Sequence, residues 1–107
     1  MMPDKSHFFK DLPAFDEPQV LGEAIDSYKR SIEKEPENAQ HYYHLGRAYH
    51  AKGKKLAAME AYQEAIRLKK DYYPAYCGIA MIYAGIGKIK LAIKEYSRAI
   101  RINSDCI

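Results

Sequence analysis

The stretch YYHLGRAY at residues 42–49, followed by Gly53, Ala58 and Tyr62, decides the fold of this chain. The same order of aromatic, small and aliphatic side chains returns 34 residues later. The matched pairs are Tyr42 and Tyr76, Leu45 and Ile79, Gly46 and Ala80, Tyr49 and Tyr83, Gly53 and Gly87, Ala58 and Ala92, Tyr62 and Tyr96, Ala65 and Ala99, and Ile66 and Ile100. A fixed period of this kind predicts stacked supersecondary units rather than one irregular globule.

The spacing resembles that of the tetratricopeptide repeat (TPR) family, whose pattern is W-x2-L-G-x2-Y, then A-x3-F, then P. Here tyrosine replaces tryptophan at Tyr42 and phenylalanine at Tyr62, while Leu45, Gly46 and Tyr49 stand at the family spacing. The resemblance covers residues 39–103 well and residues 20–38 in part. It implies an all-α fold, a TPR-type α-solenoid of antiparallel helix hairpins, and a non-catalytic module that binds proteins.

Apolar residues at helical spacing predict five helices, over about 19–35, 39–52, 54–70, 74–86 and 88–103. Pro36 ends the first because the residue before a proline avoids helical angles. Asn38 is placed to cap the second, and Gly53 to stop it in the left-handed region. The expected division is an N-terminal arm over 1–18, then a TPR domain over 19–107. This domain would hold a half repeat over 19–38 and repeats over 39–72 and 73–107.

The N-terminal arm is rich in phenylalanine and interrupted by prolines. Pro13 would break a helix that otherwise matches the start of a repeat. We therefore expect an irregular or short-helical arm whose Phe8, Phe9, Leu12 and Phe15 pack on the next helix. The alternative is that the arm leaves the body and docks elsewhere.

Composition is that of an ordinary globular protein with an uneven charge. The chain has 107 residues and a net charge of +3. Residues 1–51 hold 6 Lys/Arg and 9 Asp/Glu, whereas residues 52–107 hold 11 and 5. The basic half would attract acidic partners, and nucleic acid is the less favoured partner. No apolar run approaches the ~18 residues of a membrane span, and the start lacks a secretion signal. We expect a cytoplasmic protein with two reduced thiols, Cys77 and Cys106.

The sequence offers no set of catalytic residues. It lacks a glycine-rich phosphate loop and any Ser/His/Asp or Cys/His spacing typical of a nucleophile. His41, His44 and His50 are the best candidates for an ion site, but they have no further ligand in register. We therefore predict a protein that is not an enzyme and has no metal or cofactor.

The predicted binding surface follows from the resemblance. In the TPR fold, the first helices of successive repeats line the concave groove with residues not used in packing. Arg47 offers a planar cation for a carboxylate, and Met81 an adaptable apolar contact. We expect a peptide or partner segment with an acidic group beside an aliphatic or aromatic side chain. The alternatives are that this surface faces water or the phenylalanine-rich arm. The predicted peptide-binding residues are Gln40, Tyr43, His44, Arg47, His50, Cys77, Met81 and Ala84.

The last helix suggests rival functions. Its seam residues Leu91, Tyr96, Ile100 and Ile102 have no following helix in the sequence to cover them. Self-association through this uncapped helix is therefore expected, and a scaffold that forms homo-oligomers is the alternative function. A further alternative is a targeting domain excised from a larger enzyme.

Overall fold

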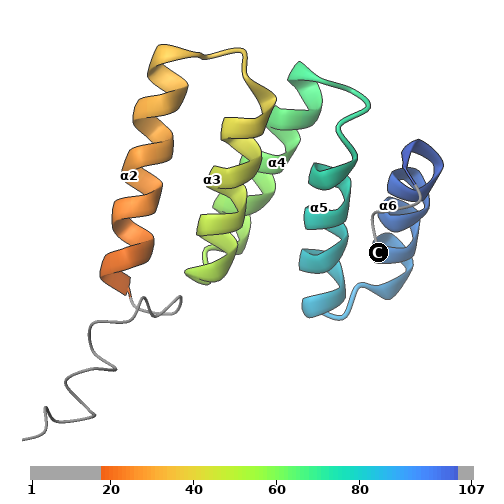
Figure 1. Ribbon diagram of the computed structural model, residues 1–107. Coiled ribbons are helices and arrows are strands. Elements are labelled where there is room, and N and C mark those ends of the chain that lie inside the picture. The colour runs from red at the N-terminus through yellow and green to blue at the C-terminus, as the bar shows by residue number, and fades with distance from the viewer. Residues whose placement is uncertain (1–17, 104–107) are drawn as a thin grey trace, which may run out of the picture.

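The computed structural model describes residues 18–103 and consists, over that range, of helices alone (Figure 1). The prediction of an all-α chain is thereby confirmed. The proposed arm lies outside the described residues, except for Pro18. The helices are α2 (Pro18–Lys34), α3 (Ala39–Ala51), α4 (Lys55–Leu68), α5 (Tyr73–Gly85) and α6 (Ile89–Ile102).

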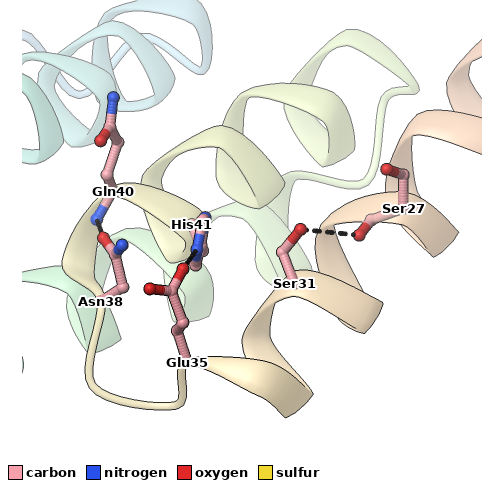
Figure 2. A network of polar contacts seen from close by, with 6 residues as sticks. All are labelled: Ser27, Ser31, Glu35, Asn38, Gln40 and His41. Atoms are coloured by element: carbon pink, nitrogen blue, oxygen red, sulfur yellow. Dashed lines mark hydrogen bonds and ion pairs between the residues drawn. The ribbon is translucent and has the colours of Figure 1, made fainter.

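The turn between α2 and α3 is built by proline and asparagine. Pro36 lies two residues beyond the end of α2, as expected for a residue that cannot continue a helix. The side-chain oxygen of Asn38 then accepts a hydrogen bond of 3.0 Å from the backbone N–H of Gln40 (Figure 2). This contact satisfies one of the free donors in the first turn of α3.

The two hairpins have matching turns. Gly53 has φ 85° and Gly87 has φ 83°, a region that suits glycine because it has no Cβ. The backbone N–H of Lys54 donates to the carbonyl of Tyr49 at 2.9 Å, and that of Lys88 donates to Tyr83 at 2.8 Å. Both turns thus close a helix in the same way, with a bond from the residue after the glycine back into the last turn.

The helices stack in order along the chain. Figure 1 shows α2, α3 and α5 side by side, with α4 behind α3. In the described part, α3 packs against α2, α4 and α5, whereas α6 packs against α5 alone. We call the surface formed by α2, α3 and α5 the wall.

Tyr62 of α4 is the centre of the core, with only 2% of its surface exposed. Its ring lies between two glycines, Gly46 of α3 and Gly78 of α5. A Cβ at Gly46 would come within 2.8 Å of the ring, and one at Gly78 would come within 3.0 Å. Since real Cβ atoms do not approach this closely, the glycines let one aromatic ring join three helices.

Helix α6 is apolar on a side that no described helix covers. It buries Ala92 and Ala99. Its larger apolar residues remain exposed, namely Ile89, Leu91, Ile93, Ile100 and Ile102. None of the helices between residues 18 and 103 combines the length and apolar character that crossing a membrane requires.

Candidate functional site: two hollows on the wall

Two hollows open on the wall, one on each side of α3. The α3–α5 hollow has a volume of about 300 Å³. The α2–α3 hollow has a volume of about 500 Å³. The first is at the small end of the range of about 300–1,000 Å³ for ligand pockets. A site of this size suits a side chain of a docked segment rather than a large cofactor.

The α3–α5 hollow gathers most of the residues predicted from the sequence. Five of the eight line it, although they come from two different helices. Its lining consists of Tyr43, Arg47, His50, Ala51, Tyr62, Pro74, Cys77, Gly78 and Met81.

The α2–α3 hollow was not predicted, apart from two residues that line it, His44 and Arg47. The sequence predicts binding residues only on the first helices of the repeats, and α2 corresponds to a second helix. Val20 precedes the apolar stripe of α2 in the sequence, and this exposed apolar residue could have indicated a hollow beside α2. The lining consists of Val20, Leu21, Ala24, Tyr28, His44, Arg47, Ala48 and Ala51.

Arg47 is shared by both hollows and is the only charged residue that lines either of them in the described part of the chain. Its side chain is exposed, with the guanidinium carbon 5.9 Å from the centre of the Tyr43 ring. Contact with an aromatic face holds the guanidinium while leaving its donors available. Among residues 18–103 no carboxylate forms an ion pair with it. The wall therefore presents one uncompensated positive charge between two apolar hollows.

His44 is held against α2 by an aromatic contact. Its ring stacks on Tyr28 with centroids 5.5 Å apart and planes 19° apart. Burial lowers the pKa of His44 below its ordinary value, and the nearby Arg47 and His41 lower it further. The ring is consequently neutral at neutral pH, with one nitrogen that donates and one that accepts.

Tyr62, which is only 2% exposed, also lines the α3–α5 hollow. Burial raises the pKa of Tyr62 to about 12, neighbouring Tyr43 adds to the rise, and Arg47 opposes it. The phenol therefore stays protonated as a donor. No side chain or backbone group among residues 18–103 hydrogen-bonds the hydroxyl of Tyr62 or the rings of His44 and His50.

Two predicted residues lie away from the hollows. Gln40 lines a separate depression of about 720 Å³ beside the α2–α3 turn, together with Lys69 and Tyr72. Ala84 is exposed near the end of α5 and lines neither hollow. The wall thus unites six of the eight predicted residues: Tyr43, His44, Arg47, His50, Cys77 and Met81.

His41 points to the α2–α3 turn instead of the wall. Its Nε2 lies 2.7 Å from Oε1 of Glu35 (Figure 2). This hydrogen bond, with the charge of His41, lowers the pKa of the Glu35 carboxyl. Within residues 18–103 no three histidine, cysteine or acidic side chains gather as a metal site would require.

Cys77 corrects one expectation from the sequence. It is disulfide-bonded in the structure, not a reduced thiol. The other cysteine, Cys106, lies outside the described residues.

Comparison with known proteins identifies the repeats. Two sequence models described as tetratricopeptide repeat match the chain, one over residues 21–73 and one over residues 73–106. No curated protein matches. Among solved structures, a crystal structure of MamA aligns with a TM-score of 0.74 and 29% identity, over 94% of this chain and 54% of that one. A second MamA structure aligns with a TM-score of 0.71 at 29% identity, over 94% and 50%. The chain therefore spans about half the length of these structures.

Proposed function

Because the chain belongs to the tetratricopeptide repeat family, we propose that it is a non-catalytic protein–protein interaction module that docks a segment of a partner protein on its wall. The family and the MamA-like fold support a role in protein interaction. We further propose that the partner segment docks on the wall and that it carries an acidic group.

One observation carries the assignment: the guanidinium of Arg47 has no ion-pair partner among residues 18–103, and it is the only charged group that these residues bring to the two hollows. A solvated surface normally mixes charges of both signs. A single cation flanked by apolar hollows suits an acidic group, since a guanidinium binds a carboxylate through two parallel hydrogen bonds. Tyr43, His44, His50 and Met81 would surround that group.

A display experiment tests this function. Random peptides displayed on phage would be selected on the wild-type chain. The recovered peptides would then be titrated against the double variant Arg47→Glu with Met81→Glu. We expect binding to weaken at least about tenfold, a loss of about 1.4 kcal/mol or more, while the circular dichroism of the helices stays unchanged.

The matched control is Leu56→Glu, which changes a residue that is 82% exposed on α4 and lines neither hollow. It should leave binding intact. Peptides that bind the double variant as tightly as the wild type would place the site elsewhere and refute the proposal.

A second function, assembly of several copies through α6, is favoured by a separate observation. Met59, Ile66 and Leu68 of α4 are half-buried, whereas Ile93, Ile100 and Ile102, their counterparts one period later, are exposed. Exposed apolar side chains at corresponding positions match an internal helix of a stack that lacks its neighbour.

Sedimentation velocity over a wide concentration range tests assembly. We expect the average mass to rise with concentration, and Ile93→Lys, at a position that is 59% exposed, to suppress the rise. Leu56→Lys serves as the matched surface control. A constant monomer mass at every concentration would exclude this second function.

A further inference from the structure

The two hollows and the arginine between them define a pattern in the ligand. We propose that the wall binds an extended peptide segment in which one acidic residue lies between two apolar residues, each two positions away. This inference rests on the proposed function, because it specifies the ligand of the same wall.

The charge of the lining selects the middle residue. Arg47 contributes to both hollows, and among residues 18–103 no aspartate or glutamate lines either one. The cation is therefore at the boundary between the hollows, where a ligand carboxylate would meet it. A neutral side chain at that position would leave the guanidinium without an ionic partner on a surface from which the bound ligand has excluded water.

The apolar linings select the residues on each side. Met81, which is 53% exposed, lines the α3–α5 hollow, and Val20, which is 37% exposed, lines the α2–α3 hollow. Docking apolar side chains on these two residues removes apolar surface of both partners from water.

The distance across α3 sets the spacing. Packed helices lie about 8–10 Å apart, so the grooves on the two sides of one helix are separated by about 10 Å. In an extended chain every second side chain points the same way, and residues four apart are separated by about 13 Å. Side chains at positions one and five that lean toward each other can span the shorter distance between the grooves. Position one then fills one hollow, position three reaches Arg47, and position five fills the other hollow.

The free polar groups favour an extended ligand over a helical one. The hydroxyl of Tyr62 and the rings of His44 and His50 have no hydrogen-bond partner within residues 18–103. An extended segment carries unsatisfied backbone donors and acceptors that these groups can meet. A helix satisfies its backbone internally and would leave them unpaired.

The test uses the full chain and short capped synthetic peptides, with binding measured by fluorescence anisotropy. The reference peptide has two leucines four positions apart, a glutamate midway and serines elsewhere. We expect it to bind at least about tenfold more tightly than the same peptide with glutamine at the centre. In Arg47→Gln this preference should fall to about one.

Two matched lysine variants, Val20→Lys and Met81→Lys, assign the leucines to the hollows. Each variant should weaken binding of the reference peptide. Two further peptides have serine in place of one of the two leucines, and each variant should leave the affinity of one of these two peptides unchanged. The peptide concerned should differ between the two variants. Leu56→Lys should change none of these affinities.

The inference fails if both lysine variants leave the affinity of the same single-leucine peptide unchanged. It also fails if a helical peptide with leucines seven positions apart binds more tightly than the reference peptide. It also fails if glutamate and glutamine peptides bind equally. In each case, phage-selected peptides that still lose affinity in the Arg47→Glu, Met81→Glu variant would leave the proposed function standing. Peptides unaffected by that variant would refute the function itself.

Discussion

At the scale of single residues, Tyr62 connects the two hairpins by its size. The ring is bracketed by Gly46 on one side and Gly78 on the other. It cannot move away from one helix without approaching the other. The tolerance of this site for added volume should therefore be low.

We predict that Gly78→Ala lowers the free energy of unfolding by about 1–3 kcal/mol, the usual cost of overpacking a core. Urea denaturation followed by circular dichroism would measure the change. Gly22→Ala is the control, because a Cβ at this helical glycine meets nothing within 4 Å. That variant should gain up to about 1 kcal/mol, since alanine favours helix. Equal effects of the two substitutions would contradict the packing described for Tyr62.

His44 makes stability depend on pH. Its pKa in the folded chain is below the ordinary 6.5, chiefly through burial. As the pH falls, the unfolded chain therefore takes up a proton at this residue before the folded chain does. Its contribution to stability is full above about pH 6.5 and is lost as the pH falls toward the folded pKa. The urea midpoint should drop between about pH 7.5 and about pH 5.5, and His44→Gln should drop less. Parallel losses in both proteins would refute this role for His44.

The wall residues show what sequence could and could not supply. The period placed Tyr43, Arg47 and Met81 on one surface, because equivalent positions of stacked helices face the same way. It could not show that Arg47 has no carboxylate partner among residues 18–103. Glu35 and Glu37 precede it in the sequence, and only the fold directs Glu35 to His41 instead. Ala84 was placed by the same period but lines neither hollow.

At the scale of helices, α2 is held less firmly than α4. In the described part, the backbone of α2 lies close to that of α3 alone, whereas the backbone of α4 lies close to those of both α3 and α5. The main anchor of α2 is Ile25, which is 6% exposed and belongs to a cluster with Leu45, Ala48 and Ala61. Opening of α2 should therefore precede global unfolding.

We predict that amide hydrogens of α2 exchange faster than those of α4 in native conditions, as measured by mass spectrometry. Ile25→Ala, with an expected cost of about 2–5 kcal/mol, should increase exchange in α2 and leave α5 protected. Ile82→Ala, at a core position in α5, should instead increase exchange in α4 and α5. Uniform exchange in the Ile25 variant would show that the helices unfold as one unit.

Helix boundaries were predictable to within about two residues because turn residues fix them. Asn38 and Pro36 set the α2–α3 turn, and Gly53 and Gly87 set the turns within the hairpins. The sequence predicts a start of α2 at Gln19, one residue after its start in the structure. The sequence pattern assigns Pro18 to the arm, but it is the first residue of α2, because a proline is tolerated in the first turn, where its missing N–H has no partner to lose.

At the scale of the whole molecule, charge should act on the rate of association. Lys52, Lys54, Lys55, Lys69 and Lys70 are all exposed. None of them lines either wall hollow, although Lys69 lines the depression beside Gln40. Long-range attraction would speed the encounter with an acidic peptide but would add little once the complex has formed.

We predict that raising the salt concentration from about 50 mM to about 300 mM lowers the association rate of the glutamate peptide roughly three- to tenfold and changes its dissociation rate less. Stopped-flow fluorescence would measure both. The double variant Lys69→Gln with Lys70→Gln should reduce the dependence on salt. A salt effect confined to dissociation would mean that the lysines contact the bound ligand directly.

The glycine at position 78 has a consequence for how such a chain can be lengthened. The residue one period before it is His44. In a tandem duplication of residues 39–72, the ring of Tyr62 would meet an imidazole where it now meets a bare backbone. A cassette taken from residues 73–106 would instead present glycine to Tyr96, the counterpart of Tyr62. Of the two units, only residues 73–106 have a glycine at the position that meets the tyrosine of the preceding unit. Lengthening of the array by duplication should therefore copy this unit.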